Sequence, residues 1–100
     1  MRSAVLLVAA LAAAPLAVSA QQPDAGRDLA ASCAMCHGTN GRSAHPGFKA
    51  LAGMDRATLA TELKNFRDGK RPATVMHQIA KGYTDAEIDL LAAFFAAQKK

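Results

Sequence analysis

The chain has few of the residues that usually hold a small protein together. Its 100 residues include two cysteines, one tyrosine, four phenylalanines and no tryptophan. A domain this short buries only a thin core and usually needs a disulfide, a metal or a bound group to be stable. A disulfide between Cys33 and Cys36 would close too short a loop to stabilise the chain much. The composition therefore predicts that something larger is bound near these cysteines.

No apolar run is long enough to span a bilayer, which takes about 20 consecutive apolar residues. The most apolar run, residues 4–14, follows Arg2 and precedes a stretch of small residues that ends at Ala20. This order is typical of a secretory signal peptide with its cleavage site. We therefore expect residues 1–20 to be a cleaved signal peptide, residues 21–100 to be a single domain, and the mature protein to be periplasmic, with no stable membrane span. Cleavage a few residues earlier and a retained anchor stay open as alternatives.

The chain also lacks any concentration of charge. Its formal net charge is +4 at pH 7, and the positive residues are scattered along the sequence. There is no arginine-rich run and no basic patch interleaved with aromatic residues, so the sequence predicts no binding to nucleic acid. The mild excess of positive charge predicts at most a weak preference for acidic protein partners.

The apolar pattern lacks the alternation of β-strands and predicts an all-α fold. The clearest helix start is Thr84-Asp85-Ala86-Glu87, a capping box in which the Glu87 side chain reaches back to the cap. Asp55 can cap another helix. The expected helices are Asp24 to Cys33, Arg56 to about Asp68, Val75 to Ala80, and a last helix that begins after Thr84 and brings Lys99 and Lys100 to its C-terminal end. The expected inward face of this last helix consists of Ile88, Leu91, Ala92 and Phe95.

Both cysteines fall within the segment Cys33-Ala34-Met35-Cys36-His37. Cys-x-x-Cys is used by redox dithiols, by zinc sites and, when His follows directly, by covalent haem attachment. A thioredoxin-type dithiol lies at a junction of strand and helix, and the sequence predicts no strands. A structural zinc site needs four ligands, and a second cysteine pair is absent. The segment therefore predicts one covalently attached haem c per chain, with a simple disulfide as the remaining alternative.

Covalent attachment gives each of the three residues a role. Cys33 and Cys36 would form thioethers on one edge of the haem, and His37 would bind the iron as an axial ligand. The other ring nitrogen of His37 should donate to a backbone carbonyl, which fixes the orientation of the ring. The loop from Pro46 to Lys49 is the expected source of that carbonyl.

The second axial ligand decides the chemistry of such a site. An open position favours ligand binding or catalysis, whereas a thioether favours electron transfer. Met35 lies between the cysteines, on the His37 side of the ring, and cannot reach across it. Met76 follows a whole predicted helix and a proline break, so the chain is long enough to wrap around the haem edge. Met76 is the expected ligand, and the other candidates are Met54, His77 and His45.

Beyond these features, the sequence resembles the class I cytochromes c. The resemblance is closest to the cytochrome subunit of flavocytochrome c sulfide dehydrogenase, which is related to the cytochrome c4 and c553 group. It rests on CAMCHGTNG, on LAGMD at residues 51–55 and above all on the segment from Ala73 to Thr84. It implies a small fold whose N- and C-terminal helices pack around one covalently bound haem, with Met76 as the axial methionine. Family members often carry proline where Lys49 stands, and many of these subunits hold two haem domains.

The resemblance implies an electron carrier that is not an enzyme by itself. Its expected partner is a sulfide-oxidising flavoprotein subunit, since the chain has no flavin-binding motif of its own. Alternatives are a freestanding cytochrome that carries electrons to a terminal oxidase or reaction centre, and a haem-based sensor of small ligands. The partner is expected to dock beside the exposed haem edge, on Ala34, Met35, Ala73, Thr74 and Val75, with Lys70, Arg71 and Lys81 as a basic rim.

Overall fold

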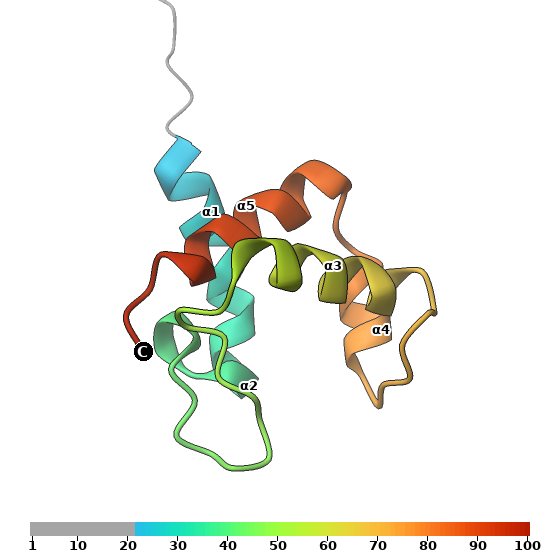
Figure 1. Cartoon of the computed structure of the whole chain (residues 1–100), viewed down its shortest axis with the longest axis horizontal. Coiled ribbons are helices and arrows are strands. Elements are labelled where there is room, and N and C mark those ends of the chain that lie inside the picture. Colours follow the sequence, from blue (N-terminus) through green and yellow to red (C-terminus); the bar gives the residue numbers. More distant parts are fainter. Residues whose placement is uncertain (1–21) are drawn as a thin grey trace, which may run out of the picture.

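The computed structural model describes residues 22–100 (Figure 1). The expected signal peptide therefore lies outside the described residues. All regular elements of the described part are helices, joined by loops, and it has no strand, as the sequence predicted. Its elements in chain order are α1 (Gln22–Ala30), η1 (Ala31–Cys33), α2 (Ala34–His37), η2 (Thr39–Gly41), α3 (Arg56–Arg67), α4 (Met76–Ala80) and α5 (Asp85–Ala96). Between residues 22 and 100, no helix combines the length and the apolar character that crossing a bilayer requires.

The helix boundaries differ from the sequence prediction at both ends of the chain. The first α-helix runs from Gln22 to Ala30 and not from Asp24 to Cys33, so Asp24 lies inside it, and the 3-10 turn η1 continues to Cys33. Pro23 suits this first turn, because the first amides of a helix have no partner within the helix. At the other end of the chain, α5 stops at Ala96. Lys99 therefore follows the helix, and its carbonyl accepts a hydrogen bond of 2.6 Å from the Arg42 side chain.

The predicted caps at Thr84 and Asp55 are confirmed. The Thr84 hydroxyl accepts a hydrogen bond from the Glu87 amide at 3.2 Å, and the Glu87 carboxylate accepts one from the Thr84 amide at 3.0 Å. At the start of α3, the Asp55 carboxylate accepts a bond of 2.9 Å from the Thr58 amide. Hydrogen bonds from the amide and hydroxyl of Thr58 lower the pKa of Asp55. This cap therefore contributes stability above the ordinary aspartate pKa, and the contribution is lost as the pH falls through the lowered value.

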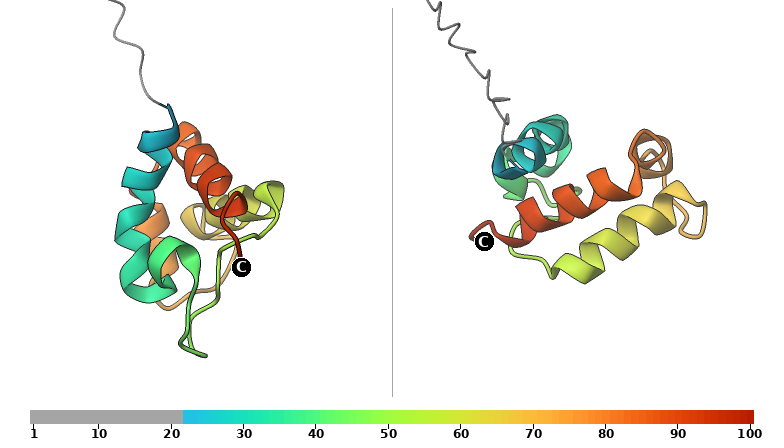
Figure 2. Two further views of the ribbon diagram at one scale, coloured as in Figure 1. Left: turned by 90° about the vertical axis from the view of Figure 1, so that its left-hand side faces the viewer. Right: turned by 90° about the horizontal axis from the view of Figure 1, so that it is seen from above.

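Helix α5 supplies half of the buried hydrophobic residues. Its predicted inward face is buried as expected, since Ile88 and Ala92 are fully covered and Leu91 and Phe95 nearly so. Ala30 from α1 and Leu59 from α3 join this cluster from opposite sides. Burying a large apolar side chain contributes about 1.5–3 kcal/mol. As a result α5 lies between α1 and α3, as the view from above shows (Figure 2).

Helix α1 crosses α5 at a glycine. A Cβ atom built on Gly26 would lie 2.9 Å from the backbone oxygen of Leu90 and 3.3 Å from the Cβ atom of Phe94. Cβ atoms do not approach backbone oxygen this closely, so only glycine permits the observed distance between the helices. The crossing fixes α1 against α5, and with α1 the cysteine segment that follows it.

Substituting Gly26 by alanine tests this crossing. In an unhindered helix the change would be favourable by about 1 kcal/mol. Here we expect it to lower the free energy of unfolding by about 1–3 kcal/mol, because the Leu90 oxygen belongs to a helix backbone and cannot move aside. Denaturant unfolding followed by circular dichroism measures the change.

The matched control is Gly82→Ala. A Cβ atom at Gly82 would meet its nearest neighbour at 3.4 Å, which is ordinary contact. This variant should keep nearly the stability of the wild type. A Gly26→Ala variant as stable as Gly82→Ala would contradict the close crossing.

Candidate functional site

The segment that carries both cysteines forms the end of the N-terminal helical region. Cys33 ends η1, Cys36 and His37 lie in α2, and α2 stops at Gly38, whose φ is +80°. A side chain at Gly38 would also collide with the backbone of Arg42, because its Cβ would lie 2.4 Å from that carbonyl oxygen. The turn therefore depends on glycine, and it directs the chain away immediately after His37.

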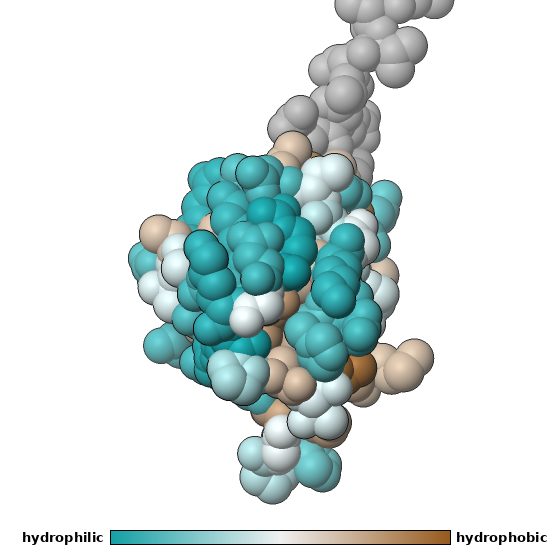
Figure 3. Space-filling model, turned by 90° about the vertical axis from the view of Figure 1, so that its right-hand side faces the viewer, coloured by the Kyte–Doolittle hydropathy of each residue, from teal (hydrophilic) through white to brown (hydrophobic). Residues whose placement is uncertain are grey.

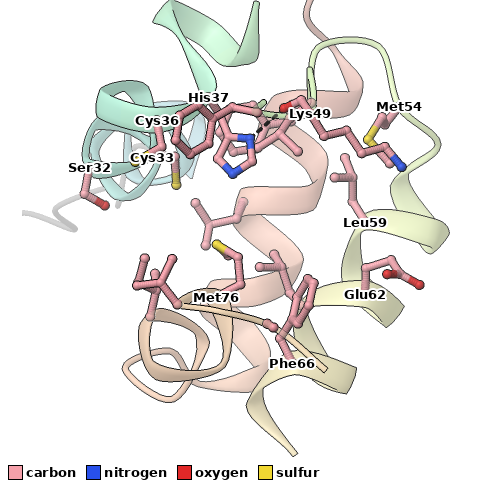
Figure 4. A pocket seen from close by; sticks show the side chains of 18 of the residues that line it. Ser32, Cys33, Cys36, His37, Lys49, Met54, Leu59, Glu62, Phe66 and Met76 are labelled. Atoms are coloured by element: carbon pink, nitrogen blue, oxygen red, sulfur yellow. Dashed lines mark hydrogen bonds between the residues drawn. The ribbon is translucent and has the colours of Figure 1, made fainter. Parts of the chain in front are cut away.

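Cys33, Cys36 and His37 line a cavity of about 450 Å³. Its other walls come from the loop before α3, from α3 itself, from α4 and from α5. Most of the lining is apolar, with leucines, phenylalanines and methionines predominating. Figure 4 shows the two cysteines together at one side of this space. Burial raises the pKa of the Cys33 thiol, and the nearby Cys36 adds to the rise while a hydrogen bond with Ser32 opposes it.

The orientation of the His37 ring is fixed by the loop that the sequence pointed to. His37 Nδ1 and the carbonyl oxygen of Lys49 lie 2.6 Å apart. A carbonyl can only accept, so Nδ1 carries the hydrogen and Nε2 keeps its lone pair. Figure 4 shows the second ring nitrogen pointing into the cavity. The expected acceptor is thus confirmed, and the lysine that stands in place of the family's frequent proline still supplies it.

The Lys49 loop is itself tied to the core. The carbonyl of Gly41 accepts hydrogen bonds from the amides of Leu51 and Ala52 at 2.8 and 3.1 Å. Gly41 has a φ of +77°, and a Cβ atom there would lie 2.8 Å from the Phe95 ring. The loop is therefore held against α5 by a backbone contact that needs glycine. The ring of Phe48 also meets His37 edge-on, with centroids 6.3 Å apart.

Met76 lies on the wall of the cavity opposite His37. It is the first residue of α4, and α4 packs against α3. In Figure 4 its sulfur points across the space toward the His37 ring. An imidazole nitrogen and a thioether sulfur thus approach the same space from two sides, with the cysteine sulfurs at a third.

The other candidate donors are placed less favourably. Met35 is 93% exposed and does not line the cavity. The Nδ1 atom of His45 accepts a hydrogen bond from the Gly47 amide, and neither His45 nor His77 lines the cavity. Met54 does line it, but it packs against the core cluster and lies in Figure 4 on the side away from the cysteines. Among the candidates, Met76 alone points at the free nitrogen of His37.

The structure adds a charged pair that the sequence analysis did not identify. Glu62 and Arg71 both line the cavity and form an ion pair. The Arg71 guanidinium also lies over the Phe66 ring, 4.9 Å from its centroid. A signal was present in the sequence, because Glu62 falls between Leu59 and Phe66 at helical spacing and so shares their apolar face. Arg71 was expected on the rim of a docking surface; it is exposed, and it also pairs with this carboxylate.

A second missed contact joins two walls of the cavity. The hydroxyl groups of Ser32 and Tyr83 lie 3.2 Å apart and can share a hydrogen bond. Ser32 precedes the first cysteine, whereas Tyr83 follows α4, and both line the cavity. The bond therefore connects the cysteine segment with the segment that holds Met76. No local pattern predicts a contact between residues so far apart in the sequence.

The cavity matches the demands of a covalently held porphyrin. It offers an apolar space, two thiols at one side, and an imidazole nitrogen and a thioether sulfur on facing walls. Together with the helical fold, these donors define a c-type cytochrome of class I. The family model of cytochrome c matches residues 23–99. The chain belongs to the cytochrome c family, and its cofactor is haem c, attached covalently.

Individual relatives agree with this assignment. The chain is 40% identical over 88 residues to the cytochrome subunit of sulfide dehydrogenase from Chlorobaculum tepidum, an alignment that covers 88% of this chain and 79% of that one. It is 36% identical over 95 residues to cytochrome c4 of Pseudomonas aeruginosa, covering 95% of this chain and 47% of that one. The structure of Acidithiobacillus ferrooxidans cytochrome c4 superposes with a TM-score of 0.71 at 30% identity, covering 77% of this chain and 50% of that one. The chain thus spans about half the length of these c4 cytochromes. The described domain is an electron-transfer cytochrome.

Proposed function

We propose that this chain carries single electrons through one haem c that is attached at Cys33 and Cys36 and ligated by His37 and Met76. The observation that carries the proposal is the arrangement of donors around the cavity. The free nitrogen of His37 and the sulfur of Met76 face the same space from opposite walls, beside both cysteines. When bound, the haem supplies the one-electron couple of its iron.

Each residue has a distinct task in this proposal. The cysteines tether the porphyrin, so that little further entropy is lost when His37 binds. The Lys49 carbonyl holds the imidazole in one tautomer and strengthens it as a ligand. A methionine sulfur as second ligand raises the reduction potential and leaves no position open for small molecules. These properties favour electron transfer over ligand sensing.

We further propose that the electron donor is a flavoprotein that oxidises sulfide. The similarity to a cytochrome subunit of sulfide dehydrogenase over most of both chains supports this partner. The similarity to cytochrome c4 supports the alternative, a freestanding carrier between other redox proteins. Both functions agree with residues 1–20 acting as a signal peptide, with residues 21–100 as the mature domain in the periplasm.

The proposed docking surface lies beside the cysteines and α4. Met35 is 93% exposed and Val75 is 48% exposed, which is unusual for such apolar residues. In Figure 3 hydrophilic residues cover most of the side that faces the viewer, and hydrophobic ones reach the surface toward its lower part. Apolar residues at the centre with charged residues around them are typical of protein interfaces. Since Arg71 pairs with Glu62, the proposed basic rim consists of Lys70 and Lys81.

Native purification separates the two partner hypotheses. A tagged chain isolated from its own host should bring a flavin-containing chain with it, and this complex should persist at high salt because apolar contacts are not screened. Absorption of the flavin and a count of haem per chain measure the result. A chain that elutes alone under mild conditions would favour the freestanding carrier.

Haem attachment depends on both cysteines in this proposal. The double variant Cys33→Ser with Cys36→Ser should lose its haem on acid-acetone extraction, whereas the wild type should retain one haem per chain. The variant should also be largely unfolded by circular dichroism, because the empty cavity leaves the small core incomplete. Each single variant serves as a control that keeps one thioether. Haem retained by the double variant after extraction would refute covalent attachment at these residues.

The axial ligand is tested with two methionines of the same cavity. Met76→Ala should abolish the weak sulfur-to-iron absorption band at the red edge of the visible spectrum and lower the reduction potential. Met54→Ala should keep the band, while the lost packing lowers the free energy of unfolding by about 2 kcal/mol. If the band disappeared in Met54→Ala and survived in Met76→Ala, the roles of the two residues would be reversed.

The docking surface is tested by reversing its rim charges. Lys70→Glu combined with Lys81→Glu should slow electron transfer from an acidic redox partner at low salt by about tenfold or more, since steering by charge is lost. Stopped-flow measurements across a range of ionic strengths report the rate. Lys99→Glu, which is exposed at the far end of the chain, is the control. Equal rates for the rim and control variants would contradict this surface.

A further inference from the structure

Within the described residues three charged side chains line the cavity, and one of them has no partner of opposite charge there. Glu62 and Arg71 neutralise each other as an ion pair. The third, Lys49, uses its backbone carbonyl to accept from His37. Its ammonium makes no ion pair with any residue between 22 and 100. The walls of the cavity therefore carry one surplus positive charge.

The direction of the Lys49 side chain is visible in Figure 4. From the hydrogen bond with His37 the side chain extends toward Met54, on the side of the cavity away from Cys33 and Cys36. Leu59 and Glu62 lie on this same side. The ammonium thus ends at the edge of the cavity opposite the cysteines.

A covalently attached haem would place its two negatively charged propionates at that edge. On the porphyrin ring, the vinyl groups that react with cysteines and the two propionates lie on opposite edges. Cysteines that hold one edge therefore direct the propionates to the other. A carboxylate beside an apolar wall is costly unless a cation or hydrogen-bond donor meets it. An ionised Glu62 can neither donate a hydrogen bond to a propionate nor neutralise its charge. Arg71 already pairs with Glu62.

We propose that the Lys49 ammonium pairs with a haem propionate. This inference rests on the proposed function, because it requires haem attached at the two cysteines. Lys49 then acts on the haem site in two ways. Its carbonyl orients the axial imidazole, and its ammonium neutralises the propionate at the edge opposite the cysteines. It is a positioning and charge-compensating residue.

Such a pair should raise the reduction potential. Oxidation of the haem adds positive charge at the iron, and a nearby cation opposes this addition. Removing the ammonium leaves the propionate charge less compensated, which favours the oxidised form. The effect should exceed that of a lysine elsewhere on the surface, because the Lys49 ammonium would contact the propionate directly, whereas solvent and salt screen the charge of a more distant lysine.

Three variants separate the ammonium from the carbonyl. Lys49→Met removes the charge and keeps the length of the side chain. Lys49→Pro also removes the charge and restores the residue that the resembling family often carries. In the described part of the chain the Lys49 amide donates no hydrogen bond, so proline removes none, and its carbonyl remains to accept from His37. Lys70→Met is the control, because Lys70 is exposed and does not line the cavity.

The experiment measures the reduction potential of each haem-loaded protein by spectroelectrochemical titration, and the propionate bending band by resonance Raman spectroscopy. We expect both Lys49 variants to lower the potential by similar amounts and to shift the propionate band, whereas Lys70→Met changes the potential far less and leaves the band in place. A Lys49→Met potential equal to that of the wild type or of Lys70→Met would overturn the inference, as would an unchanged propionate band.

The outcomes also distinguish this inference from the proposed function. Wild-type protein without covalent haem, or without the sulfur-to-iron band, would overturn both. Covalent haem and an intact band in every variant, with a potential insensitive to Lys49, would overturn only the pairing of Lys49 with a propionate.

Discussion

The contact between α1 and α5 at Gly26 is the constraint on which the rest of the structure depends. Helix α1 leads directly into the cysteine segment, so its angle to α5 sets where Cys33, Cys36 and His37 lie. Helix α5 also packs against α3, which in turn supports α4 and Met76. Helix α5 thus connects the wall that carries the cysteines with the wall that carries Met76. A Cβ atom at the crossing would displace α1 and change the distance between these walls.

The cavity combines an apolar interior with a small number of satisfied polar groups. His37 donates to the Lys49 carbonyl, Ser32 can bond with Tyr83, and Glu62 pairs with Arg71. The Ser32–Tyr83 pair joins segments 51 residues apart, whereas the other two pairs hold a loop against a nearby helix. Together they fix the positions of the cavity walls relative to one another. Mostly apolar walls with few polar groups suit an electron carrier. Apolar walls have few dipoles to reorient when the charge on a bound haem changes, and would therefore add little reorganisation to each transfer.

The two uses of Lys49 connect the loop to both the ligand and the charge of the site. A proline at this position could supply only the carbonyl. The lysine adds a cation that has no partner in the described part of the chain. The proposed propionate pair would tune the reduction potential without altering the iron ligands, and would distinguish this cytochrome from relatives that carry proline.

Several features could be predicted from the sequence alone because their causes are local. The spacing of Cys33, Cys36 and His37 lies within about one helical turn, and the capping box at Thr84 joins residues three apart. The buried face of α5 follows from helical periodicity, and Ile88, Leu91, Ala92 and Phe95 are all buried, with Leu90 and Phe94 half-buried beside them. The carbonyl acceptor of His37 could be narrowed to a short loop, since the chain must return near the ring soon after Gly38.

Other features were decided only by the tertiary structure. The sequence offered several sulfur and nitrogen donors, and the packing of α4 on α3 brings Met76, rather than His77 or Met54, to face His37. The sequence also gave no ion-pair partner for Glu62, and it did not show that Arg71, which is exposed as expected, would supply one. Helix starts and buried faces depend on neighbours within one or two turns, whereas the wall that a side chain faces depends on how separate helices pack.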